Sequence, residues 1–176
     1  MENGLKEQLS QAQPAYITEA DKTFILLWDE RLKALGYTCG GEVRGGFCWG
    51  KYMLVYTKAG VKSDKSYCRV YLRDIGAAVR LYLNGVDDHR AYLEGTPDYI
   101  LDAFTNDYGA CKHCPNKQGD ACRHRKSYTL FGKLYEKCDG FTFELWHPSP
   151  ERVDGYAALL TEFYPVNGRS KKTRRV

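Results

Sequence analysis

The sequence lacks any long hydrophobic run. Apolar stretches such as residues 24–28 fall far short of the ~20 residues that a membrane-spanning helix needs. The first residues contain no basic segment followed by an apolar one, so we expect no secretory signal peptide. Together these absences predict a cytoplasmic protein that does not bind a membrane.

Recognisable catalytic motifs are also missing. No nucleophile–base arrangement, phosphate-binding loop or pair of carboxylates stands out, and Glu144 and Asp154 are isolated in the sequence. We therefore expect a non-enzymatic protein. An enzyme stays open as an alternative, because catalytic groups often converge only in the folded chain.

Seven cysteines are present, which is an odd number. Thiols stay reduced in the cytoplasm, so the cysteines are not interpreted as a disulfide framework, and disulfides are kept only as a minor alternative. Cys39, Cys48 and Cys68 are expected to be ordinary residues, with Cys68 packing on the core face of a strand. The remaining four lie within residues 111–138.

The spacing of apolar residues and the positions of turn and capping residues predict an α+β fold, with an antiparallel sheet flanked by helices. Residues 1–16 are expected to be a disordered lead-in, and residues 17–107 the core. Thr18 and Asp21 form an acid-containing capping box that opens a helix ending at Gly36. Alternating residues then predict strands at 47–57, 67–73 and 77–83, joined as a meander with one buried face.

The second half of the chain is predicted to return to the same core. Two helical pieces occupy 86–107, and Thr96-Pro97 opens the second. A cysteine-rich segment, 108–140, contains hairpin strands at 128–131 and 134–137. Residues 141–164 supply a final strand and a helix that pack on the core, and the tail, 165–176, is basic and predicted to be disordered.

Cys111, Cys114, Cys122 and Cys138 have a spacing typical of a metal site. Two cysteines separated by two residues can bind one metal from a single loop, and two later cysteines complete a tetrahedron. Four sulfur ligands in a closed shell are the usual arrangement of structural zinc. The sequence therefore predicts a loop and hairpin stapled by zinc, with an iron–sulfur cluster as the minor alternative.

Two histidines leave the ligand set open. His113 or His124 could replace one cysteine in a Cys3His shell, and the alternative is that both are solvated loop residues. An open catalytic zinc site would need only three protein ligands and a water, so four available cysteines favour a structural role.

Positive charge is concentrated in two regions, although the whole chain carries only +4. Residues 111–138 hold seven Lys/Arg and two Asp/Glu, and the tail holds five Lys/Arg and no acid. Cations beside four thiolates lower the cost of their charge. A nucleic-acid contact is the alternative interpretation.

A second candidate site is a face of the predicted meander that is rich in Tyr and Arg. Such side chains can stack on a planar or anionic ligand, although cross-strand tyrosine pairs also stabilise sheets by themselves. The residues expected on this face are Tyr52, Tyr56, Tyr67, Arg69, Tyr71, Arg73, Arg80 and Tyr82.

Part of the chain resembles a known group of proteins. Trp49-Gly50-Lys51-Tyr52, Arg69-Val70-Tyr71-Leu72 and Val79-Arg80-Leu81-Tyr82-Leu83 are similar to small uncharacterised bacterial α+β domains of the YjbR and YdhG kind. The resemblance does not include the cysteine segment. It implies an antiparallel sheet flanked by helices and a bacterial source, and it carries no function.

Three functional hypotheses follow from the sequence. The first is a zinc-stabilised module that binds a small ligand or a protein partner. The second is a nucleic-acid-associated zinc protein that uses the basic metal segment and tail. The third is the undetected enzyme, and the oligomeric state is left open.

Overall fold

The computed structural model describes residues 3–10, 17–39, 43–45, 52–58, 67–107, 125–138 and 142–165, and it has an α+β fold. The helices are α1 (Asn3–Ser10), α2 (Glu19–Ala34), α3 (Arg90–Leu93), α4 (Asp98–Thr105) and α5 (Val153–Phe163), with 3₁₀ helices η1 (Val86–His89) and η3 (Pro150–Arg152). The strands are β1 (Tyr37–Cys39), β2 (Arg44–Gly45), β3 (Tyr52–Lys58), β4 (Cys68–Arg73), β5 (Gly76–Tyr82), β6 (Arg125–Leu130), β7 (Lys133–Cys138) and β8 (Thr142–Trp146). None of the described helices is both long and apolar enough to cross a membrane.

The main sheet has the strand order β1-β3-β4-β5-β8, and β2 pairs with β3 beside this path. The β1–β3, β2–β3 and β3–β4 pairs are antiparallel. The neighbours β5 and β8 are far apart in the sequence, so the chain between them, including the hairpin of β6 and β7, is an insertion between two paired strands. The chain divides into two compact units, residues 1–79 with 146–176 and residues 80–145.

Helix α2 begins with the predicted capping box. Asp21 N–H donates to the Thr18 hydroxyl and Thr18 N–H donates to the Asp21 carboxylate, both at 3.1 Å. The second carboxylate oxygen of Asp21 accepts the N–H of Ala77 at 3.1 Å, at the start of β5. One buried acid therefore both caps the helix and fixes the β4–β5 turn against it.

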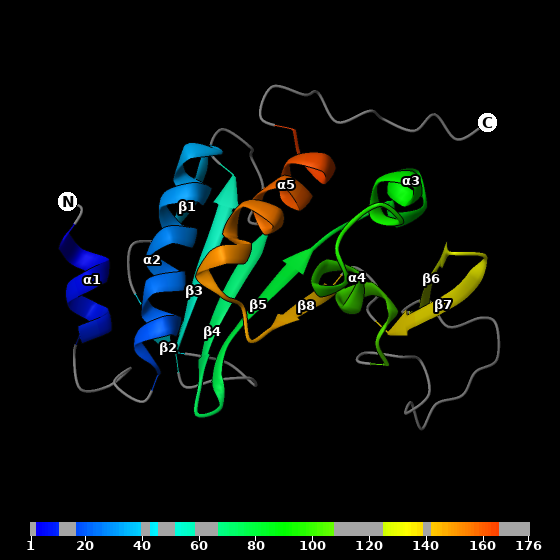
Figure 1. Cartoon of the computed structure of the whole chain (residues 1–176). Coiled ribbons are helices and arrows are strands. Elements are labelled where there is room, and N and C mark those ends of the chain that lie inside the picture. Colours follow the sequence, from blue (N-terminus) through cyan, green and yellow to red (C-terminus); the bar gives the residue numbers. More distant parts are fainter. Residues whose placement is uncertain are drawn as a thin grey trace. The chain divides into compact units, whose positions relative to one another are not determined.

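In the first unit, α2 and α5 lie side by side on one face of the sheet (Figure 1). The Tyr156 ring meets Phe24 and Trp28 edge-on, with centroids 6.2 and 6.3 Å away. All three side chains are fully buried, as expected for the apolar face of an amphipathic helix. The predicted helix 18–36 and the helix near the end of the chain are confirmed.

The second unit has its own aromatic core. Phe104 of α4 stacks on Phe143 of β8, with centroids 4.4 Å apart, and Tyr128 of β6 meets the Phe143 ring at 5.8 Å. Phe104 and Tyr128 are buried, which ties the hairpin to α4.

Three local predictions were wrong. The expected disordered lead-in contains α1, whose Leu9 is buried. The Thr96 hydroxyl donates to the Leu93 carbonyl and so caps the end of α3, while Pro97 precedes α4 without a side-chain cap. The hairpin turns at Phe131-Gly132, one residue earlier than predicted, because both residues adopt positive φ. The predicted tail lies outside the described residues, except for Pro165.

Candidate metal centre

Cys138 lies at the open end of the β6–β7 hairpin. The two turn residues, Phe131 and Gly132, have φ angles of 50° and 72°, which corresponds to the type I′ geometry that suits the twist of paired strands. From this turn the strands stay in register until Arg125 lies opposite Cys138. The backbone alternation therefore places Arg125 and Cys138 side by side on the same face of the hairpin.

Two hydrogen bonds attach the hairpin to the end of α4. The Tyr128 hydroxyl donates to the Phe104 carbonyl at 2.5 Å. The Lys137 ammonium donates to the Asn106 carbonyl at 2.6 Å. Lys137 precedes Cys138, so the second bond holds the residues just before the cysteine-rich loop beside the last residues of β7.

Both flanks of the cysteine-rich segment are therefore attached to the last residues of β7. On one flank, Cys111 follows Asn106 by five residues, which span at most about 17 Å of extended chain. On the other flank, Cys122 precedes Arg125 by three residues, or about 10 Å. Cys111, Cys114 and Cys122 themselves lie outside the described residues.

Cys138 differs in environment from Cys68, another cysteine described in the structure. Cys68 on β4 is fully buried, and burial is the main cause that raises the pKa of its thiol to about 12. A thiol held neutral in this way is a poor metal ligand and nucleophile. The prediction that Cys68 packs as a core residue is confirmed, whereas Cys138 is exposed to solvent.

No group of three or more His, Cys, Asp and Glu side chains that could hold a metal occurs among the described residues. The other predicted ligands, Cys111, Cys114, Cys122, His113 and His124, all lie outside them. Among the predicted ligands, only Cys138 belongs to the described residues.

The cations of the cysteine segment fall into different environments. Arg125 is next to Cys138, with 23% of its side chain exposed, and its guanidinium lies 3.5 Å from Glu136. Lys137 points to the opposite face of the hairpin because strand residues alternate, and its side chain is buried. Arg125 can thus support a thiolate on Cys138, while Lys137 has a structural role.

Sequence reasoning missed a buried ion pair in the second unit. The Arg80 guanidinium on β5 donates to the Glu144 carboxylate on β8 at 2.8 Å, and their side chains are only 17% and 5% exposed. Burial raises the pKa of Glu144 to about 7, against the opposing effects of Arg80 and Lys137. Glu144 is therefore not isolated, and Arg80 is paired with it rather than offered to a ligand.

The predicted face of tyrosines and arginines does not form. Tyr56 pairs with Cys68 across β3 and β4, so it shares a face with Cys68 and not with Arg69. The Tyr56 hydroxyl donates to the Asp29 carboxylate on α2 at 2.9 Å and is fully buried. Tyr52 shares the Tyr56 face by alternation, which leaves Arg69, Tyr71 and Arg73 on the other side of the sheet.

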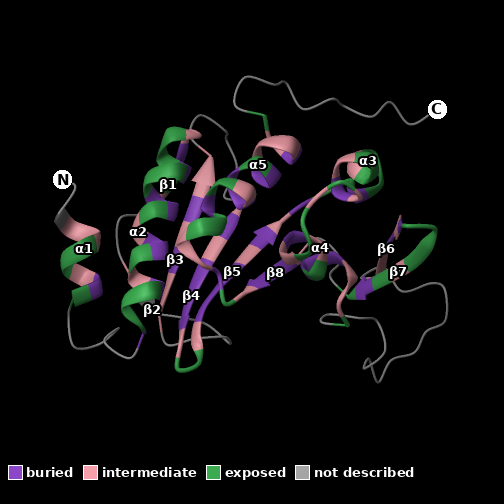
Figure 2. Ribbon diagram, viewed as in Figure 1, coloured by how far each residue is buried: buried purple, intermediate pink, exposed green. Residues whose placement is uncertain are grey.

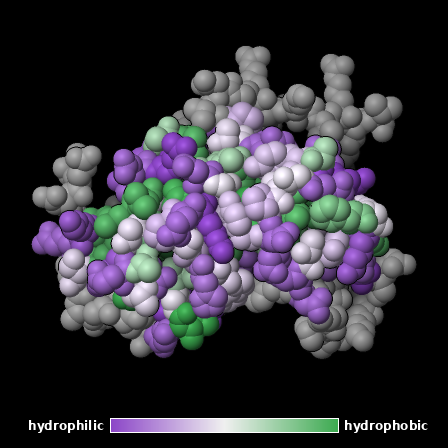
Figure 3. Space-filling model, in the orientation of Figure 1, coloured by the Kyte–Doolittle hydropathy of each residue, from purple (hydrophilic) through white to green (hydrophobic). Residues whose placement is uncertain are grey.

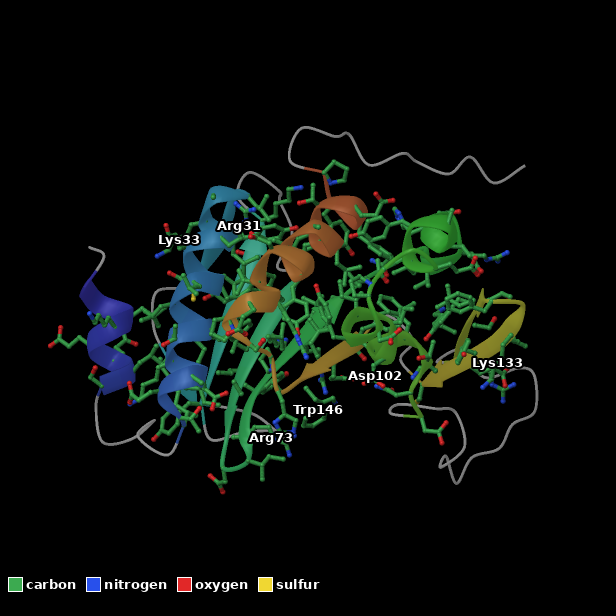
Figure 4. All side chains as sticks on the ribbon, in the orientation of Figure 1. Arg31, Lys33, Arg73, Asp102, Lys133 and Trp146 are labelled. Atoms are coloured by element: carbon green, nitrogen blue, oxygen red, sulfur yellow. The ribbon has the colours of Figure 1, made fainter. Side chains whose placement is uncertain are left out.

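The residues on that other side are engaged with each other and with their neighbours. Tyr71 is only 1% exposed, and its hydroxyl accepts a long hydrogen bond of 3.5 Å from Arg69. The Arg73 guanidinium lies 4.8 Å from the centre of the Trp146 ring (Figure 4). A buried Tyr71 cannot act as a stacking platform for a ligand. Tyr67 contacts the Tyr164 ring, and Tyr82 is half-buried.

Comparison with known proteins finds no matching family model, no matching curated protein and no matching solved structure.

Proposed function

We propose that the chain is a zinc-stabilised module that binds a protein partner and has no enzymatic activity. Cys111, Cys114, Cys122 and Cys138 would hold one structural Zn²⁺. A single observation carries this proposal, namely that both flanks of the cysteine-rich loop are anchored beside Cys138 at the open end of the hairpin.

The charges around Cys138 support a thiolate ligand. Arg125 lies directly opposite it on the same face, where paired residues have their Cβ atoms about 5 Å apart. Arg125, which also pairs with Glu136, is thus a cation on the same face as Cys138. A nearby cation favours a thiolate, the form of cysteine that binds zinc. A Cys3His shell that contains His113 or His124 has the same requirement at Cys138.

Metal analysis of the purified protein tests the proposal. We expect about one zinc per chain, and we expect Cys138→Ser to lose it to a competing chelator much more readily than wild type. Cys39→Ser, on β1 of the other unit, is the matched control and should keep the metal. Absence of zinc from reduced wild-type protein overturns the proposal, and a coloured protein that contains iron instead supports the cluster alternative.

A protein partner fits the described surface better than a small ligand. The strand register puts the side chains that were expected to stack on a small molecule on opposite faces of the sheet. Tyr56 and Tyr71 are also buried. By contrast, two large hydrophobic side chains, Phe131 and Leu134, are exposed on the hairpin. Exposed apolar groups rimmed by charged residues are typical of protein–protein contacts.

The nucleic-acid alternative predicts a different salt dependence. A protein that contacts several phosphates loses affinity steeply as salt rises, because each contact releases a counterion. Lys137 is one predicted phosphate ligand that is already bound to Asn106. Filter binding of single-stranded RNA and duplex DNA across a salt series would favour this alternative only if binding is measurable and falls steeply.

A further inference from the structure

The tip of the β6–β7 hairpin carries two large apolar side chains that are mostly exposed. Of the four large hydrophobic residues described as exposed, Phe131 and Leu134 are both in this hairpin, with 58% and 62% of their surface accessible. In the space-filling view, hydrophobic residues lie at the surface among hydrophilic ones (Figure 3). Two exposed apolar side chains three positions apart in one hairpin are typical of a binding surface.

Phe131 is also in an unfavourable backbone conformation. Its φ of 50° lies in the left-handed region, where a bulky side chain costs roughly 1–2 kcal/mol, and where Asn or Gly is the ordinary choice for this turn. Because the Phe131 side chain is mostly exposed, its partial burial contributes little free energy to offset this strain. Strain of this kind at an exposed position points to a role in binding.

The two edges of the hairpin differ in the side chains that hydrogen-bond to their outward backbone groups. On the β6 edge, the outward N–H of Thr129 donates to the Asp87 carboxylate at 3.0 Å. The outward N–H of Phe131 donates to the Glu94 carboxylate at 2.6 Å. Side chains from η1 and from the end of α3 thus cap this edge, and an incoming strand would have to displace both carboxylates to pair there.

The β7 edge carries no such caps among the described residues. Antiparallel alternation, counted from the type I′ turn, directs the backbone N–H and C=O groups of Leu134 and Glu136 away from β6. Both residues are exposed, and most of β7 is exposed with them (Figure 2). A strand edge with unpaired backbone groups and apolar neighbours is a template for another strand.

The side chains beside this edge define the chemistry of the strand that would add to it. Leu134 projects from one face of the hairpin, and Lys133 projects from the other, where its ammonium lies 5.0 Å from the centre of the Tyr135 ring. Lys133 is exposed, as Figure 4 shows at the hairpin turn. A neighbouring strand would therefore set apolar residues beside Leu134 and acidic residues beside Lys133.

We propose that the β7 edge binds an extended segment of a partner protein in which apolar and acidic residues alternate. The segment pairs with the outward backbone groups of Leu134 and Glu136. This mode of recognition draws affinity from main-chain hydrogen bonds and selectivity from alternate side chains. The inference rests on the proposed protein-binding function and specifies its surface.

Two proline variants on opposite edges of the hairpin test the inference. Glu136→Pro removes the outward N–H of β7, while Ser127→Pro removes the equivalent outward N–H of β6, because the two residues are directly opposed. Glu136→Ala controls for the loss of the carboxylate. The probe is a fluorescent synthetic peptide of alternating valine and glutamate, titrated into full-length zinc-loaded protein by fluorescence polarisation.

Wild type, Ser127→Pro and Glu136→Ala are expected to bind the peptide, and Glu136→Pro should weaken binding by about tenfold or more. Amide hydrogen exchange in the wild-type complex should become slower at Leu134 and Glu136. Equal weakening by both prolines, no saturable binding to wild type, or self-association of the chain through β7 in place of peptide binding overturns the inference.

Zinc content and circular dichroism of each variant separate this inference from the proposed function. A protein that contains zinc but does not bind the peptide refutes only the β7 docking edge. A protein that binds the peptide but contains no metal refutes only the zinc proposal.

Discussion

Burial of Glu144 makes the stability of the protein depend on pH in a direction that can be worked out. Its carboxylate accepts a hydrogen bond from Arg80, yet desolvation has the larger effect and raises the pKa of Glu144 from 4.5 to about 7. A carboxyl group with a raised pKa in the folded chain binds its proton more tightly there than in the unfolded chain. Protonation of Glu144 therefore stabilises the fold.

The size of the effect follows from the two pKa values. A shift from 4.5 to about 7 corresponds to about 3 kcal/mol at ~1.36 kcal/mol per pH unit. This contribution is fully present below the unfolded pKa and is lost as the pH rises through about 7. Between about pH 5 and about pH 8, wild type should lose about 2–3 kcal/mol from this group alone.

Glu144→Gln keeps the shape of the side chain and removes its titration. The free energy of unfolding of both proteins is measured by urea titration at the two pH values, with far-UV circular dichroism as the signal. The stability of wild type relative to the variant should fall by about 2–3 kcal/mol from the lower to the higher pH. Glu30→Gln, on the exposed side of α2, controls for a general effect of charge.

The sign of this difference is the decisive result. If the Arg80 ion pair outweighed desolvation, Glu144 would be ionised at a lower pH in the folded chain than in the unfolded one. Wild type would then gain stability relative to the variant as the pH rises. That outcome, or a difference that does not change with pH, would refute the reasoning.

Three further changes probe other parts of the structure. Tyr56→Phe removes a buried hydrogen bond to the Asp29 carboxylate and should destabilise the protein by about 1.5–3 kcal/mol in urea unfolding, while a loss under ~0.5 kcal/mol would contradict the buried bond. Phe131→Asn relieves the left-handed strain and should stabilise the protein by roughly 1 kcal/mol, and unchanged stability would argue against strain. Chelation of zinc should speed amide exchange near Cys138 and leave α2 unchanged, and uniform acceleration would show that the metal supports the whole fold.

Local signals predicted the elements of this fold well. The capping box at Thr18 and Asp21 needs only residues three apart, and the structure contains both of its hydrogen bonds. Alternation in β4 likewise predicted that Cys68 is buried. What these signals omit is the second partner of Asp21, the N–H of Ala77, because nothing near position 21 in the sequence indicates it.

The failed prediction of a tyrosine–arginine face shows why registers are hard to predict. Alternation within β3 separates Tyr56 from Val55, and alternation within β4 separates Cys68 from Arg69. Neither pattern states which residue of β3 lies opposite which residue of β4, and a shift of one residue exchanges the faces. The observed pairing of Tyr56 with Cys68 places the tyrosine ring under α2, where the Asp29 carboxylate accepts a hydrogen bond from its hydroxyl group.

The ion pair of Arg80 and Glu144 was missed for a related reason. The two residues are 64 positions apart, and only the adjacency of β5 and β8 brings them together. The one available signal was a single charged residue within each of two mostly apolar strands. Buried charges are usually paired, so two such positions of opposite sign suggest partners.

Non-local contacts also attach the β6–β7 hairpin independently of the proposed metal. A two-stranded sheet is marginal by itself, but this one is attached by carboxylates at Thr129 and Phe131 and by hydrogen bonds from Tyr128 and Lys137. These contacts do not involve a cysteine. The proposed zinc would therefore act at Cys138, while the hairpin turn and the β7 edge should persist without metal. For this reason the zinc proposal and the β7 docking edge can be tested independently.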